Sequence, residues 1–167
     1  MIEKIIETSR TYLRKLTLND AEALLAIFDD PDVMHFSVSG VRNLAQIKEF
    51  INAVLLSYEQ HNFGGWAVID KSTQQLIGGC SLNETLIDNG QHIEIAYRYI
   101  KSAWGKGYAT EVAQAVKDYG INVLQLPEII AIIQPENVDS IKVATKIGLR
   151  YSHQTIFSDF IVNIYRS

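Results

Sequence analysis

Apolar residues in this chain recur at two spacings, one typical of helices and one typical of strands. Between Leu44 and Tyr58 they recur every three or four positions, which predicts one buried face of a helix. Asn43 and Gln46 precede this pattern at the spacing of a capping box. Similar evidence predicts three further helices, which begin near Thr17, just after Gly107, and at Asn137 or Asp139.

Shorter apolar runs between turn signals predict strands. They span residues 12–15, 66–70, 76–83, 92–100, 129–133, 151–157 and 160–165. Helices and strands in this order predict an α/β or α+β fold, in which helices cover a mixed sheet. In the third helix, Val112, Val116 and Val123 are expected on the buried face. No repeat or linker interrupts the chain, so residues 1–167 are predicted to form a single domain.

Composition is that of an ordinary globular protein, with 47% hydrophobic and 20% charged residues. The start of the chain lacks a signal peptide, and the apolar run Ile129 to Ile133 is far too short to cross a bilayer. A cytoplasmic protein that does not enter membranes is therefore expected. The net charge of −4, without a lysine or arginine cluster, argues against nucleic-acid binding. A mildly acidic surface suits cationic acceptors such as amines.

Cysteine and histidine give no sign of a metal site. Cys80 is the only cysteine, and its strand-like surroundings predict a small buried residue in preference to a nucleophile. The four histidines lack the spacing of metal ligands, so no metal is predicted.

A glycine-rich turn between a predicted strand and a predicted helix is the most informative segment. It reads Trp104-Gly105-Lys106-Gly107-Tyr108-Ala109-Thr110-Glu111. Such a turn presents free backbone N–H groups at a helix N-terminus, where phosphate binds well. The alternative is that the glycines only make a tight connection. A Walker loop is excluded because Gly107 follows Lys106, and a dinucleotide fingerprint is disfavoured because Thr110 stands at its third small position.

This segment resembles the acetyl-CoA-binding motif of the GNAT N-acetyltransferase superfamily, Gln/Arg-x-x-Gly-x-Gly/Ala. Trp104 replaces the usual Gln or Arg, as in the branch that resembles ribosomal-protein-alanine acetyltransferases. Further similar segments follow the same order along the chain: Leu13-Arg14-Lys15-Leu16-Thr17 with Asp20, Glu94-Ile95-Ala96-Tyr97, Asn137-x-x-Ser140, and Lys146-Ile147-Gly148-Leu149. The resemblance implies a GNAT fold, with a mixed, mostly antiparallel central sheet that is splayed at its middle and has helices on both faces.

The resemblance also implies acetyl-CoA as co-substrate. The backbone of Tyr97, Arg98, Tyr99 and Ile100 would pair with the pantetheine arm, and the N–H groups from Gly105 to Thr110 would hold the pyrophosphate. Asn137 and Ser140 would contact the cofactor arm, although Asn137 is equally suited to cap a helix. Lys106 and Lys142 would meet phosphates, the alternative being that both are simply solvated.

The implied reaction is direct acetyl transfer from the thioester to a primary amine, which requires a base. Relatives that place a glutamate in the strand after the third helix differ from this chain, because residues 129–133 contain no acid. Ala144 likewise stands where some relatives have a tyrosine. Glu84 is the first candidate base and Glu94 the second, with a water chain as the rival, and Ser140 is the candidate proton donor to the thiolate.

The acceptor is expected to be a protein N-terminus or a small-molecule amine. Its predicted pocket walls are aromatic, with burial in the core as the alternative for each: Phe36, Trp66, Phe157 and Phe160. A monomer or homodimer is expected. The alternative function is a GNAT-fold module that binds CoA without turnover, suggested by the missing strand glutamate and helix tyrosine.

Overall fold

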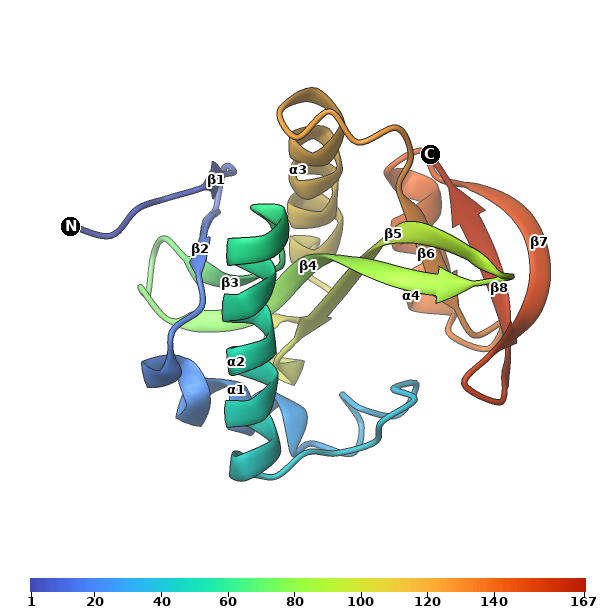
Figure 1. Ribbon diagram of the computed structural model, residues 1–167. Coiled ribbons are helices and arrows are strands. Elements are labelled where there is room, and N and C mark those ends of the chain that lie inside the picture. The colour runs from blue at the N-terminus through green and yellow to red at the C-terminus, as the bar shows by residue number, and fades with distance from the viewer.

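A single eight-stranded sheet organises the protein, and the computed structural model describes residues 1–167 (Figure 1). The strands lie in the order β1-β2-β3-β4-β5-β6-β8-β7, and only the β5–β6 pair is parallel. The strands are β1 (Ile6–Glu7), β2 (Thr11–Lys15), β3 (Gly65–Asp70), β4 (Leu76–Ile87), β5 (Gly90–Tyr99), β6 (Ile130–Ile133), β7 (Arg150–Phe157) and β8 (Phe160–Arg166). The helices are α1 (Ala21–Phe28), α2 (Leu44–His61), α3 (Tyr108–Asn122) and α4 (Val138–Lys146).

Helices cover both faces of the sheet, as expected. On one face, Val54 of α2 packs against Gly65 of β3, and Arg98 of β5 lies against Phe28 of α1. On the other face, Trp66 of β3 contacts Tyr119 of α3 edge-on, with ring centroids 5.8 Å apart. Helix α4 lies on this second face as well, where the hydroxyl of Tyr97 reaches its backbone. We call the two faces the α1/α2 face and the α3/α4 face.

The sheet is splayed between β5 and β6. These strands share one paired position, Glu94 opposite Ile130, and then diverge. Strand β5 continues to Tyr99 alongside β4, while β6 continues to Ile133 alongside β8. The backbone edge of β5 beyond Glu94 is therefore free of a strand partner on its β6 side.

Local signals in the sequence account for most element boundaries. Asn43 and Gln46 form the predicted capping box of α2, with both side-chain-to-backbone bonds at 2.9 Å. Asp88 and Asn89 both adopt positive φ, as a two-residue hairpin turn requires, and β4 extends to meet this turn. Val123 is 62% exposed, contrary to prediction, because α3 ends one residue before it.

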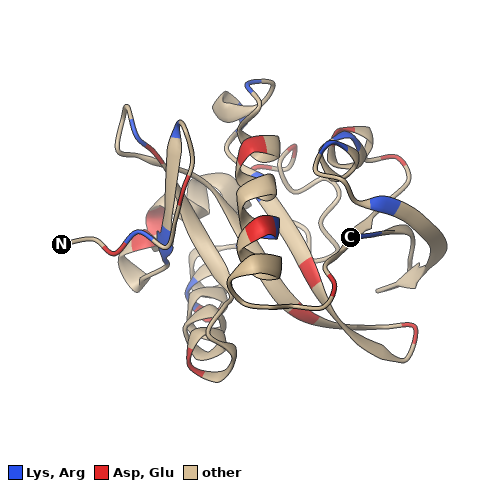
Figure 2. Cartoon of the chain, turned by 90° about the horizontal axis from the view of Figure 1, so that it is seen from above, with Lys and Arg blue, Asp and Glu red and all other residues tan.

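Charged residues are interspersed along the chain (Figure 2). Basic and acidic positions both occur on helices, strands and turns, and no long stretch of the ribbon carries basic positions alone. None of the helices combines the length and hydrophobicity needed to cross a bilayer.

Candidate functional site

The glycine turn between β5 and α3 is held in a left-handed backbone conformation. Gly105 has φ of 70° and Gly107 has φ of 81°, values that side chains with a Cβ rarely adopt. A Cβ at Gly105 would meet no atom within 4 Å, so the turn is open to solvent on that side. Gly107 is the N-cap of α3, which places the turn directly at a helix N-terminus.

The backbone N–H groups of residues 105–110 have no hydrogen-bond partner within the protein. The nearest bonded amides are those of Trp104, which bonds to Lys101, and Glu111, which bonds to Gly107. Free amides at the start of a fifteen-residue helix, together with the helix dipole, favour an anion. The N–H groups of residues 108–110 are unpaired as in the first turn of any helix without a side-chain cap, and the glycine turn adds those of residues 105–107.

Arg10 fixes this turn from the neighbouring β1–β2 hairpin. Its guanidinium donates to the carbonyl of Lys106 at 2.7 Å and to the carboxylate of Glu111 at 2.8 Å. The same group lies 4.3 Å from the ring centroid of Tyr108. The hydroxyl of Tyr108 donates in turn to Asp70 at 2.5 Å. The sequence analysis missed Arg10, because nothing in its local pattern connects it to a turn almost a hundred residues away.

Hydrogen bonds hold the carboxylate of Asp70 in its charged form. Donation from Ser72 and then from Tyr108 lowers its pKa well below the usual range, against a smaller effect of burial. At the other end of the turn, the indole N–H of Trp104 donates to the carbonyl of Tyr99 at 3.0 Å. Lys106 is exposed, and so is Lys142, whose Nζ lies 3.8 Å from Asp139.

Tyr97, Asn137 and Ser140 meet where β5 approaches α4. The hydroxyl of Tyr97 donates to the carbonyl of Ser140 at 3.0 Å, and burial raises the pKa of Tyr97. Asn137 Oδ1 accepts from the N–H of Ser140 at 3.3 Å, so this side chain caps α4. The capping role uses only the oxygen of Asn137, and its amide N–H₂ group remains free. The hydroxyl of Ser140 makes no hydrogen bond within the protein.

The two candidate bases lie on opposite faces of the sheet. Glu94 projects on the α1/α2 face, where Thr85 Oγ1 donates to its carboxylate at 3.1 Å. Burial raises the pKa of Glu94 to about 7, an effect that the hydrogen bond from Thr85 and the charge of Arg98 only partly oppose. Glu84 projects on the other face, is exposed, and lies 3.5 Å from His61.

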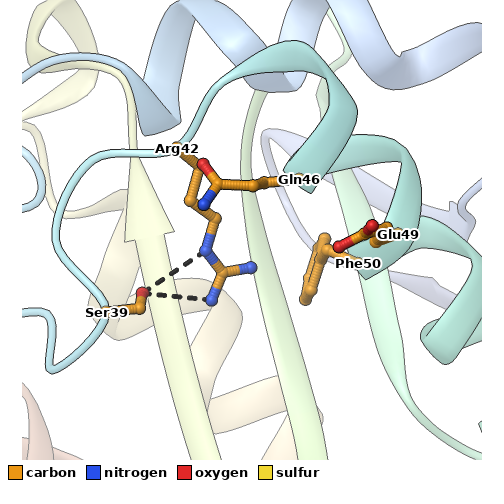
Figure 3. Close-up of a pocket in the computed structure, with 5 residues that line it drawn as sticks. All are labelled: Ser39, Arg42, Gln46, Glu49 and Phe50. Atoms are coloured by element: carbon orange, nitrogen blue, oxygen red, sulfur yellow. Dashed lines mark hydrogen bonds between the residues drawn. The ribbon is translucent and has the colours of Figure 1, made fainter.

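An open pocket is formed by the segment before α2 and the first turns of α2. Its lining residues are Ser39, Arg42, Gln46, Glu49 and Phe50 (Figure 3). Arg42 donates to Ser39 Oγ from Nε at 3.3 Å and from Nη2 at 3.2 Å. None of these residues was predicted to line a pocket, and Gln46 was predicted only as a member of the capping box of α2.

The predicted aromatic walls are dispersed. Trp66 is 2% exposed and packs against Tyr119 of α3, so it belongs to the core. Phe157 packs partly buried at the far end of the sheet, and Phe160 is exposed at the β7–β8 turn. Phe36 lies in the α1–α2 loop, and its carbonyl accepts from Gln134 at 3.0 Å. Of the four, Phe36 has the position most compatible with an acceptor pocket.

Similarity to known proteins agrees with this geometry. The family model of the acetyltransferase (GNAT) domain matches residues 10–150. The chain belongs to the GNAT acetyltransferase family. It is 37% identical to YkkB of Bacillus subtilis (strain 168) over 146 residues, covering 87% of this chain and 84% of YkkB. It is 35% identical over 150 residues to the uncharacterised N-acetyltransferase p20 of Bacillus licheniformis, covering 86% and 80%.

The fold is also that of solved GNAT structures. RimL, a ribosomal-protein acetyltransferase solved in complex with coenzyme A, superimposes with a TM-score of 0.82 at 16% identity, covering 99% of this chain and 97% of RimL. At this identity the likeness establishes the fold. With the family model and the curated relatives, it identifies this GNAT protein as an N-acetyltransferase.

Proposed function

We propose that this GNAT protein moves an acetyl group directly from acetyl-CoA to a primary amine, within a complex that holds both substrates. The observation that carries the proposal is the row of unpartnered amides at residues 105–110, next to the free edge of β5. The amides match a pyrophosphate, since several donors converge on the N-terminus of α3. The free edge matches a pantetheine arm, whose amides would pair with β5 as an added strand does.

On this proposal, the acceptor approaches from the α1/α2 face and Glu94 is the general base. Its pKa of about 7 suits proton transfer near neutral pH, because a useful base is half-ionised close to the operating pH. Glu84 is less suited to this role, since it is exposed and lies on the opposite face. This assignment reverses the order of preference that the sequence alone suggested.

The chemical step follows from these assignments. The amine loses a proton to Glu94, directly or through water, and its lone pair then forms a bond to the carbonyl carbon of the thioester. The carbon–sulfur bond breaks, and the departing thiolate takes up a proton. The hydroxyl of Ser140, which has no partner in the protein although its backbone groups are both engaged, relays this proton: it donates to the sulfur and regains a proton from the nitrogen of the new amide, directly or through water. Positioning both substrates supplies much of the rate enhancement.

Binding and turnover measured together test the proposal. Calorimetric titration with CoA should give a single site, and incubation with acetyl-CoA and a panel of peptide N-termini and small amines should release free thiol. Gly107→Ala should weaken CoA binding because it adds a Cβ to the cradle at a positive φ. CoA binding without thiol release for every amine would instead support the non-catalytic alternative, and the absence of CoA binding would refute both.

A further inference from the structure

Two arginines on the α1/α2 face share one aromatic ring. The guanidinium carbon of Arg98, on β5, lies 5.4 Å from the ring centroid of Phe28. The guanidinium carbon of Arg42, which precedes α2, lies 5.3 Å from the same centroid and 5.1 Å from that of Phe50. Both cations are thus held within one aromatic cluster beside the pocket of Figure 3.

Neither arginine has an acidic partner. Arg10, Arg14 and Arg166 each form an ion pair with a carboxylate at 2.7 to 2.8 Å. Arg42 instead bonds only to the hydroxyl of Ser39, and the guanidinium of Arg98 makes no hydrogen bond within the protein. Burial, followed by the charge of Arg42, lowers the pKa of Arg98 to about 10, and Glu94 opposes this effect only weakly. Two partly buried cations that share one aromatic ring and repel each other destabilise the protein unless an anion compensates them.

The position of Arg98 relates this pair to the proposed acceptor site. Glu94, Ala96 and Arg98 alternate with core residues and therefore project on the same face of β5. Ala96 separates the acid from the arginine, and Ser81 lies opposite Ala96 on β4. The small side chains of Ala96 and Ser81 leave room above the strand between Glu94 and Arg98. The backbone positions of these two residues are roughly 13 Å apart along the strand.

We propose that Arg98 and Arg42 form a subsite for an anionic group on the acceptor, so that the preferred acceptor is an amine that also bears a carboxylate or a phosphate. A guanidinium with free donors binds either oxyanion in a bidentate manner. Glu49 also lines the pocket beside Arg42, and Glu94 projects on the same face of β5 as Arg98, so acids for the ammonium end accompany both arginines. This inference rests on the proposed function, and it replaces the expectation of a purely cationic acceptor drawn from the net charge of −4.

Matched acceptors test the preference. Thiol release from acetyl-CoA would be measured for straight-chain amino carboxylates, the corresponding aminoalkyl phosphates, the neutral amino amides, and diamines of equal length. The anionic amines should exceed the neutral and cationic ones by roughly 10- to 100-fold in kcat/KM, the range expected for hydrogen bonds to a charged group. The carboxylate and phosphate series identify which anion is preferred. Equal or faster turnover of the amides and diamines would overturn the proposal.

Substitutions then locate the effect. Arg98→Gln and Arg42→Gln should abolish the preference for anionic amines, measured as the ratio of kcat/KM between matched anionic and neutral acceptors, and Arg98→Lys should retain part of it. Arg150→Gln, at an exposed position on β7, is the control and should retain the preference. Loss of turnover to the same extent for every acceptor would overturn the proposal. Calorimetry with CoA separates this result from a failure of the proposed function, because CoA binding must persist in all four variants.

Discussion

Replacing Glu94 by glutamine should make the protein more stable and less active at the same time. The carboxylate is partly buried, and its pKa is raised from 4.5 to about 7 mainly by burial. One pKa unit corresponds to 1.36 kcal/mol, so ionised Glu94 destabilises the folded state by up to about 3 kcal/mol. Glutamine keeps an oxygen that accepts from Thr85 and removes this charge.

The pH dependence of this effect has a definite sign. A carboxylate whose folded pKa is raised favours folding below its unfolded pKa of 4.5, and this contribution is lost as the pH rises through about 7. Glu94→Gln should therefore raise the melting temperature above pH 8 by roughly 6 to 12 °C, and change it little near pH 4. Thermal unfolding followed by circular dichroism across this range measures the difference.

Activity should change in the opposite direction. As general base, Glu94 must be ionised, so kcat/KM should increase with pH up to about 7, and this limb should disappear in Glu94→Gln. We expect kcat/KM of the variant to fall roughly 100- to 10,000-fold above pH 8. The acceptor in this assay should be an amine of low pKa, so that its own titration does not contribute to the pH profile.

Glu84→Gln is the matched control, and it should change stability by less than about 1 kcal/mol because its carboxylate is exposed. Unchanged activity and pH profile in Glu94→Gln would refute the assignment.

Three further predictions concern the cofactor side and the single cysteine. Gly107→Ala should lower CoA affinity at least tenfold in calorimetry. Gly40→Ala should not, because Gly40 also has a positive φ but lies in the α1–α2 loop. Equal losses of affinity in the two variants would point to backbone strain in the whole protein as the cause. Arg10→Ala should also weaken CoA binding by loosening the turn, with less than about 1 kcal/mol lost in chemical denaturation, because Arg10 is exposed; unchanged affinity would count against its positioning role. Cys80 should resist thiol reagents in the native state, since complete burial raises its pKa, and rapid labelling without unfolding would contradict its position in the core.

Local chemistry made the fold and the geometry of the glycine turn predictable. Capping pairs, hairpin turns and hydrophobic spacing are set by neighbours within a few residues, and the glycine turn with α3 is one continuous segment. The backbone N–H groups supply the donors in this turn, so the side chains around Gly105 and Gly107 only need to leave these groups accessible. The two-residue strand β1 was not predicted, because its length gives no measurable periodicity.

The acceptor side was not predictable in the same way. Arg42 and Arg98 lie more than fifty residues apart in sequence, and only the packing of α1 against β5 brings both guanidinium groups to the ring of Phe28. Trp66 was expected in a pocket because its aromatic character suits both a wall and a core, and only the position of α3 decides between them. Which of Glu94 and Glu84 is better suited as general base likewise depends on how deeply each is buried, and a single sequence does not reveal this.

On the proposed function, the alternation of side chains along β5 lets one strand serve two substrates. Side chains of successive residues point to opposite faces, so Tyr97 reaches α4 while Glu94 and Arg98 reach the α1/α2 face. The splay after Glu94 frees the strand edge between these faces, where a thioester can meet an amine from the other side. A one-residue shift in the register of β5 would send Glu94 and Arg98 to the α3/α4 face and Tyr97 to the α1/α2 face. The long pairing with β4, from Gly78 to Ile87, fixes this register and therefore the assignment of each face.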